Sequence, residues 1–146
     1  MTIPNLPCMC ASLRRSSRAI TQLYDEALRP LRLRATQFTI LQVLSRVGEV
    51  SQGELGQILA MDSTTLTRTL EILDRHGWIN KRRGKDSRER LLRLAKAGQE
   101  RFQRAIPAWE KAQAQLRHRL GSKRWHDLLE TSNEVTHLLM KQGESS

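Results

Sequence analysis

Cysteine and long apolar runs are both scarce in this sequence. Its 146 residues include only two cysteines, Cys8 and Cys10. They lie too close together to connect distant parts of a fold, which excludes a disulfide scaffold. No apolar run approaches the roughly twenty residues that cross a bilayer. The N-terminal residues have neither the basic start nor the apolar stretch of a signal peptide. We therefore expect a cytoplasmic protein without a membrane partner.

Motifs of the common enzyme classes are absent as well. The sequence has no nucleophile motif, no glycine-rich phosphate loop and no paired carboxylates in a recognisable frame. The four histidines, His76, His118, His126 and His137, lack the close spacing of metal ligands. We therefore expect neither an enzyme nor a protein that depends on a metal or another cofactor.

Acidic residues are few relative to basic ones. Lys and Arg number 25 against 15 Asp and Glu, which gives a formal net charge of +10 at pH 7. Such an excess on a small body favours a polyanionic partner, nucleic acid first and an anionic membrane second. Because 38% of the residues are hydrophobic and 27% are charged, the composition is that of a folded soluble protein.

Apolar residues recur at helical spacing near both ends of the chain. This periodicity predicts four helices, over residues 11–31, 35–47, 99–120 and 122–141. Pro30 breaks the end of the first helix, Gly98 resets the chain before the third, and Gly121 separates the last two. Pro107 lies inside the third helix, where we expect a kink or a fresh helix start.

Two shorter helices are predicted between these. Ser51 and Glu54 form a capping box before a helix of about two turns. Asp62 caps the next helix, over 63–75, whose backbone donors favour phosphate at its start. A major groove of DNA admits one such helix with its polar face outward. Serine and threonine are also ordinary at helix starts. The candidate DNA contacts on this helix are Ser63, Thr64, Thr65, Thr67 and Arg68.

A basic hairpin follows, with strands predicted over 78–83 and 88–94. Its cations can reach backbone phosphates or the adjacent minor groove. We expect the Asp86 carboxylate to hold the Arg88 guanidinium in place through paired hydrogen bonds, or to form an ordinary surface ion pair with it. The candidate DNA contacts in the hairpin are Arg82, Arg83, Lys85, Asp86 and Arg88.

This order of elements resembles the winged-helix core of the multiple-antibiotic-resistance regulator (MarR) family. The residues that match the family pattern are Leu73, Gly77, Trp78, Ile79, Asp86, Arg88, Leu94 and Gly98. Ala95 stands where the family usually has threonine, and the wing tip is about one residue short. The resemblance implies a mainly α fold. A winged helix-turn-helix with a small β-hairpin wing spans residues 35–98, and helical dimerisation regions span 1–34 and 99–146.

The same resemblance implies a sequence-specific transcriptional regulator. Its partners are a second copy of the chain and a pseudo-palindromic operator in double-stranded DNA, and it acts as a repressor that an effector releases. Common effectors in the family are small aromatic acids and oxidants. A nonspecific architectural DNA-binding protein with the same fold is the alternative.

The cysteines resemble part of the family's organic-hydroperoxide-sensing branch. There a reactive cysteine opens the first helix and is followed at fixed spacings by a Ser-Arg pair and a tyrosine. The residues at those spacings are Cys10, Ser17, Arg18 and Tyr24. Two further tyrosines of that branch correspond to Arg14 and Ala35, so the match is incomplete. Cys8 and Cys10 are candidate redox-sensing thiols together with Tyr24, candidate ligands for a thiophilic metal or arsenical, or inert.

Overall fold

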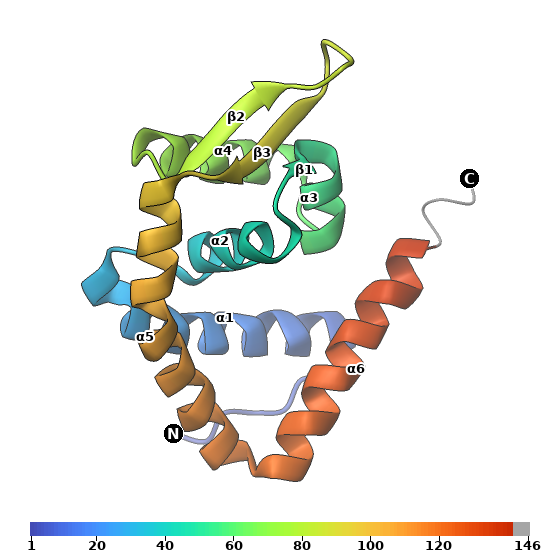
Figure 1. The fold of residues 1–146 in the computed structure, drawn as a ribbon. Helices are drawn as coiled ribbons and strands as arrows, with labels where there is room; N and C mark the ends of the chain where they lie inside the picture. Colours follow the sequence, from blue (N-terminus) through green and yellow to red (C-terminus); the bar gives the residue numbers. More distant parts are fainter. Residues whose placement is uncertain (142–146) are drawn as a thin grey trace.

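A computed structural model describes residues 1–141 of the chain, the last of them in its backbone only, so 142–146 of the predicted dimerisation region lie outside the described residues. Within that range the chain forms helices and three short strands (Figure 1). In chain order the elements are α1 (Met9–Leu28), the 3-10 helix η1 (Arg29–Leu31), α2 (Ala35–Val47), β1 (Val50–Ser51), α3 (Gln52–Leu59), α4 (Ser63–Arg75), β2 (Ile79–Arg83), β3 (Arg90–Leu94), α5 (Lys96–Leu120) and α6 (Ser122–Lys141).

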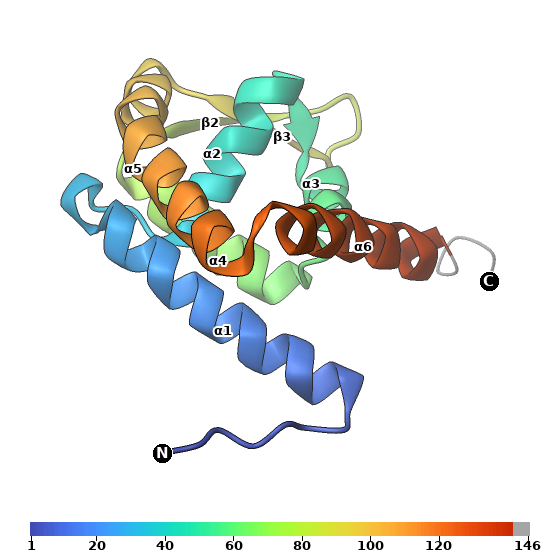
Figure 2. The same cartoon turned by 90° about the horizontal axis from the view of Figure 1, so that it is seen from below.

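The elements form two regions. We call α2 to β3, residues 35–94, the winged unit, and α1, α5 and α6 the frame. In Figure 1, α5 leaves the sheet and passes α2 and α1, and the chain then turns so that α6 rises on the other side of a V. Seen from below, α6 stands apart from α1 (Figure 2). The mainly helical winged-helix fold predicted from the sequence is confirmed.

Local sequence signals set the ends of the helices in the winged unit. The Ser51 hydroxyl accepts a hydrogen bond from the Glu54 backbone N–H at 3.1 Å, and the Glu54 carboxylate accepts one from the Ser51 N–H at 3.3 Å. This is the predicted capping box, and α3 begins directly after it. Asp62 caps α4 by accepting a hydrogen bond from Thr65 N–H at 2.8 Å. Gly77, after α4, has a φ of +73°, which glycine adopts without strain.

The wing is a three-stranded antiparallel sheet in the order β1-β3-β2. Its hairpin was predicted, with strands that are shorter in the structure because 88 and 89 belong to the turn. The strand β1 was not predicted. It is two residues long and is defined by pairing with β3, where Val50 faces Leu92. Alternation along β3 buries Leu92 completely and leaves Arg93 exposed.

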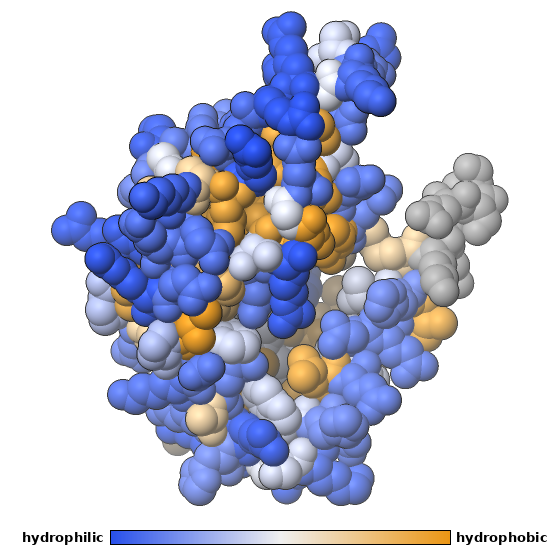
Figure 3. Space-filling model, in the orientation of Figure 1, coloured by the Kyte–Doolittle hydropathy of each residue, from blue (hydrophilic) through white to orange (hydrophobic). Residues whose placement is uncertain are grey.

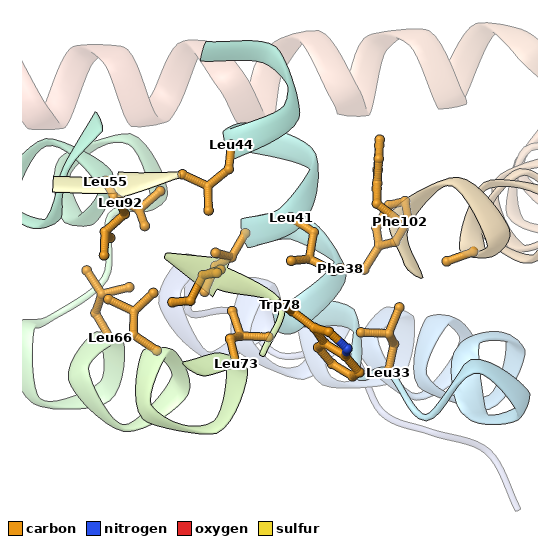
Figure 4. Packing of buried hydrophobic residues seen from close by; sticks show 14 of the residues in the cluster. Leu33, Phe38, Leu41, Leu44, Leu55, Leu66, Leu73, Trp78, Leu92 and Phe102 are labelled. Carbon is orange, nitrogen blue, oxygen red and sulfur yellow. The ribbon is translucent and has the colours of Figure 1, made fainter. Parts of the chain in front are cut away.

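One hydrophobic core holds the winged unit together and extends onto α5 (Figure 4). The inward-facing leucines of α4, Leu66, Leu70 and Leu73, are all at most 2% exposed. Phe38 of α2 packs on Phe102 and Trp109 of α5, with ring centroids 5.4 and 5.7 Å apart. Trp109 is therefore a packing residue, and α5 is anchored to the winged unit.

Two predictions about helix ends were wrong. The first helix begins at Met9 rather than 11, and α5 begins at Lys96 rather than 99. Gly98 does not reset the chain but lies buried in the first turn of α5. A Cβ atom there would lie 1.9 Å from the Trp78 carbonyl oxygen, so glycine permits close packing at this point. The helix also runs through Pro107 without a fresh start.

Several apolar side chains of α6 are exposed. Figure 3 shows a few orange patches among the blue side chains along this helix. Leu138 is 59% exposed and Leu139 is 63% exposed, in contrast to the leucines of α4. Along the described part of the chain, none of the helices is long and apolar enough to cross a membrane.

Candidate nucleic-acid interface

The face of α4 opposite its buried leucines presents four polar side chains. Thr64, Arg68, Glu71 and Arg75 recur at intervals of four, three and four residues, which places them on one stripe. All four are exposed. Thr64 and Arg68 were predicted as DNA contacts. Arg75 lies on the same stripe but was not among the predicted contacts, although its spacing of seven from Arg68 was visible in the sequence.

The start of α4 already holds a carboxylate. Asp62 accepts hydrogen bonds from the Thr65 backbone N–H and, at 2.7 Å, from the Thr65 hydroxyl. These bonds, the backbone one first, hold the pKa of Asp62 below its ordinary value. Because a negative charge occupies this helix end, the phosphate expected there would have to compete with Asp62. Thr65 acts in the cap of the helix.

Thr67 and Ser63 complete the predicted set on α4. The Thr67 hydroxyl accepts a hydrogen bond from the Gln52 side-chain amide at 3.1 Å, which joins α4 to the start of α3. Ser63, the first residue of α4, is exposed and lines a groove between α3, the start of α4 and the wing. The groove encloses about 950 Å³ and is also lined by Arg88 and Arg90. The wing and α4 therefore present polar groups to a common space.

Arg82 is paired within the protein. Its guanidinium donates two hydrogen bonds to the Glu49 carboxylate, from Nε at 2.8 Å and from Nη2 at 2.6 Å. This bidentate pair joins β2 to the loop before β1. The hydrogen bond from Arg82 is the main cause that holds the pKa of Glu49 below its ordinary value. Arg82 was predicted as a DNA contact, and its partner, 33 residues away in sequence, left no local signal.

The other predicted wing cations have no such partner, and the projecting wing is hydrophilic in Figure 3. Arg83, Lys85 and Arg88 are exposed, and none forms an ion pair within 4.0 Å of another described residue. The prediction that Asp86 holds the Arg88 guanidinium was wrong. Its carboxylate instead accepts a hydrogen bond from the Arg88 backbone N–H at 3.1 Å. Asp86 therefore shapes the turn, and the Arg88 side chain is not restrained by it.

The cysteines lie at the far end of the frame. Cys8 stands at the N-cap position of α1 without a side-chain capping bond, Cys10 lies in the first turn, and both thiols are free and exposed. Tyr24 lies fourteen residues along the same helix, about 21 Å from Cys10 at the rise of an α-helix. Its hydroxyl donates a hydrogen bond to Gln113 of α5, and burial raises its pKa. A single chain therefore does not bring Tyr24 to the thiols.

Among the described residues, no cluster of three or more His, Cys, Asp or Glu side chains that could hold a metal is found. The two cysteines and the four histidines are thus not assembled into a site with three or more ligands within one chain.

One family of known proteins matches the part of the chain that contains most of the winged unit. The sequence model of the MarR family matches residues 33–89. An uncharacterised HTH-type transcriptional regulator of Bacillus subtilis, YwoH, is 32% identical over 91 residues, which cover 62% of this chain and 66% of that protein.

Solved structures match over most of the chain. The M. tuberculosis transcriptional regulator MosR, in complex with DNA, is 32% identical with a TM-score of 0.81, and the match covers 90% of this chain and 96% of that one. A mutant of E. coli MarR in complex with operator DNA is 23% identical with a TM-score of 0.76, over 84% of this chain and 89% of that one, and it shows the shared fold. These proteins are regulators rather than enzymes, and the chain belongs to the MarR family of DNA-binding transcriptional regulators.

Proposed function

We propose that this protein is a homodimeric repressor that reads a pseudo-palindromic operator through α4 and grips it through the wing. The observation that carries the proposal is the pairing of two surfaces. One is the outward stripe of α4, where Thr64 and Arg68 are exposed, and the other is a wing whose Arg83 and Arg88 have no ion-pair partner among the described residues.

The two surfaces have different tasks. A guanidinium on an exposed helix face in the major groove can donate two hydrogen bonds to guanine, so Arg68 is the residue we assign to sequence discrimination. Cations on a projecting hairpin meet phosphates, which carry no sequence information, so Arg83, Lys85 and Arg88 are assigned to affinity. Arg82 and Thr65 are assigned to the internal structure of the interface.

Dimerisation is supported by the frame. Leu128, Val135 and Leu139 of α6 follow one another at seven and four residues, which places them on one face of the helix, and all three are exposed in a single copy. Contiguous apolar surface of this kind marks an interaction site in soluble proteins. We assign a second copy of α6 as the partner that covers this apolar face. A symmetric dimer would also present two copies of α4 to the two half-sites of an operator. MosR and E. coli MarR, both solved with DNA, have the same fold.

The experiment is a gel-shift titration at physiological salt with the duplex around the protein's own promoter and a scrambled duplex of equal length. Arg68→Ala is expected to lower the ratio of the two affinities by about tenfold or more, which corresponds to the loss of one bidentate base contact. Arg83→Ala is expected to weaken both duplexes alike. Arg119→Ala, an exposed cation of the frame, serves as the control.

The outcomes separate the candidate functions. Equal affinity of the wild-type protein for both duplexes would favour a nonspecific architectural protein and reject the operator. Stimulation of transcription from the bound promoter in a purified system, instead of inhibition, would reject the repressor.

For the effector we propose oxidation at the start of α1, because both thiols are exposed there and a helix N-terminus favours the thiolate. The Cys10 thiolate would attack a peroxide oxygen and become a sulfenic acid, with release of an alcohol. The Cys8 thiol would then displace water from that sulfur and form a disulfide. The disulfide would form at the start of α1, which is one of the helices of the frame.

The test is release of bound DNA by an organic hydroperoxide. Wild type is expected to release DNA on oxidation and to rebind it after reduction by a thiol, and Cys10→Ser is expected to stay bound. Release from Cys10→Ser at the wild-type rate would remove this cysteine from the mechanism. The same assay with aromatic acids and with trivalent arsenicals tests the two other effector classes. A response to aromatic acids that survives replacement of both cysteines would favour a small-molecule pocket, and an arsenical response that is lost on this replacement would favour ligation by the thiols.

A further inference from the structure

Trp78 lies where the winged unit meets the frame. The residue is only 5% exposed, and its indole lies between Leu73 of α4 and Leu33 (Figure 4). Trp78 follows Gly77 at the end of α4 and directly precedes β2. Its carbonyl oxygen accepts a hydrogen bond from the backbone N–H of Ala95, the residue before α5, at 3.0 Å. The end of α4, the base of the wing and the start of α5 therefore converge on one residue.

The first turn of α5 packs directly against this tryptophan. The Gly98 Cα faces the Trp78 carbonyl so closely that any side chain there would clash with backbone atoms. On the indole ring itself, His76 stacks with a centroid separation of 4.2 Å and an interplanar angle of 13°. The tryptophan is thus held from several sides, and a shift of α5 has to move it.

Arg101 lies one turn further along α5 and connects Trp78 to the rest of the frame. Its guanidinium carbon lies 5.2 Å from the centroid of the indole, within the range of a cation–π contact. Its Nη1 donates a hydrogen bond to the carbonyl oxygen of Leu31 at 3.0 Å. Leu31 ends η1, which continues α1. One side chain therefore contacts both the end of α1 and the tryptophan at the base of the wing.

The covalent links between the two regions are few. The chain passes from the frame to the winged unit through residues 32–34, and back through Ala95. Arg101 spans the two links, since Leu31 precedes the first and Trp78 contacts the second. A guanidinium restrains orientation as well as distance, because it is planar and its hydrogen bond and its stacking face have fixed directions.

We propose that Arg101 is a positioning residue that sets the angle of the winged unit on the frame, and thereby the separation of the two reading surfaces in the dimer. This rests on the proposed function, in which two copies read two half-sites. A small rotation at the joint displaces α4 as a rigid body. Loss of Arg101 therefore loosens the requirement for one half-site spacing while each α4 still reads its own half-site.

The experiment measures spacing preference with the full chain. The probe is a duplex selected from a random pool by the wild-type protein, with variants that lengthen or shorten the gap between half-sites by one and two base pairs. Wild type is expected to bind the selected spacing best. Arg101→Ala is expected to lose about two- to thirtyfold in affinity at that spacing, the usual range for residues that couple two regions, and to bind the altered spacings nearly as well.

Two further variants separate positioning from folding. Arg104→Ala removes an exposed cation from the same helix and is expected to keep the wild-type preference. Arg101→Lys keeps the charge and a donor for the Leu31 carbonyl but loses the planar group over Trp78, so its preference is expected to fall between the other two. If Arg101→Ala fails to fold, the spacing preference of Arg101→Lys tests the proposal instead. An Arg101 variant that keeps the wild-type spacing preference would overturn the proposal.

A second measurement needs no DNA. Spin labels on Ser87→Cys, at the two wing tips of a dimer in which Cys8 and Cys10 are serine, report the separation of the winged units. We expect a narrow distance distribution that broadens in Arg101→Ala and not in Arg104→Ala. If the wild-type protein prefers no half-site spacing, the proposed function fails. The distance distributions alone then test whether Arg101 positions the winged unit. An unchanged width in Arg101→Ala would then refute the positioning role.

Discussion

Helices α4 and α6 both carry several leucines and bury them to opposite extents. The leucines of α4 are at most 2% exposed, whereas Leu138 and Leu139 of α6 are 59% and 63% exposed. The difference lies in their neighbours, since α4 contributes to a closed core shared with α2 and the sheet, while α6 stands at the edge of the V (Figures 1 and 2). The core of the winged unit is thus closed within one chain, whereas apolar side chains of α6 remain exposed, which supports the proposed second copy.

The largest effect is expected in the closed core of the winged unit. Leu70 is 1% exposed, so Leu70→Ala removes packed methyl groups and is expected to lower the free energy of unfolding by about 2–5 kcal/mol. Chemical denaturation followed by circular dichroism measures this. A loss below about 1 kcal/mol would show that the core relaxes around the cavity. It would contradict the view that the leucines of α4, unlike those of α6, belong to a tightly packed core.

A substitution on α6 should act on assembly instead. Leu139→Asp places a charge on the exposed apolar face and is expected to shift the protein from dimer to monomer while the helical circular dichroism is retained. Ser132→Asp, at an exposed polar position of the same helix, is the matched control. Sedimentation equilibrium gives the mass. A dimer of unchanged stability in Leu139→Asp would place the dimer contact elsewhere.

Removal of one cation should affect DNA binding when the cation lies in the wing, but not when it lies in the frame. Arg83→Ala in the wing is expected to weaken DNA binding several-fold and to lower the slope of log affinity against log salt by about one. Arg119→Ala, also an exposed arginine but in the frame, is expected to leave that slope unchanged. Affinities by fluorescence anisotropy at four salt concentrations test both. Equal slopes for the two variants would contradict the assignment of phosphate contacts to the wing rather than to the frame.

The smallest effect concerns the ion pair at the base of the wing. The Arg82 hydrogen bonds hold the pKa of Glu49 below its ordinary value of 4.5, so the carboxylate stabilises the fold above that value, and this contribution is lost as the pH falls through the lowered pKa. The NMR shift of Arg82 Nε–H should therefore be constant from pH 7 to about 5 and change only below pH 4.5. In Glu49→Gln that change should be absent. A change centred above pH 5 would contradict the pairing.

Local signals in the sequence account for most helix boundaries. The ends of α2, α4 and α6 fall where periodicity, caps and glycines predicted them. The errors arose where a contact distant in sequence decides the structure. Gly98 resembles a helix breaker locally, but it lies inside α5 because it packs on Trp78, and β1 exists only through its pairing with β3.

The candidate interface shows the same division. Helical spacing was sufficient to predict Thr64 and Arg68 on the outward face of α4. It did not reveal that Glu49 pairs with Arg82, or that Gln52 binds Thr67, because those partners are 33 and 15 residues away. Which cations remain available to a ligand is set by such tertiary contacts, and composition alone does not determine them.

The most direct test of the central claim is hydroxyl-radical footprinting of the wild-type protein on the selected duplex, with the stoichiometry measured on the same sample. Two winged units on one frame predict two protected half-sites about one helical turn apart, with two chains bound to each duplex. A single protected half-site with one chain, or uniform protection along the duplex, would contradict the account.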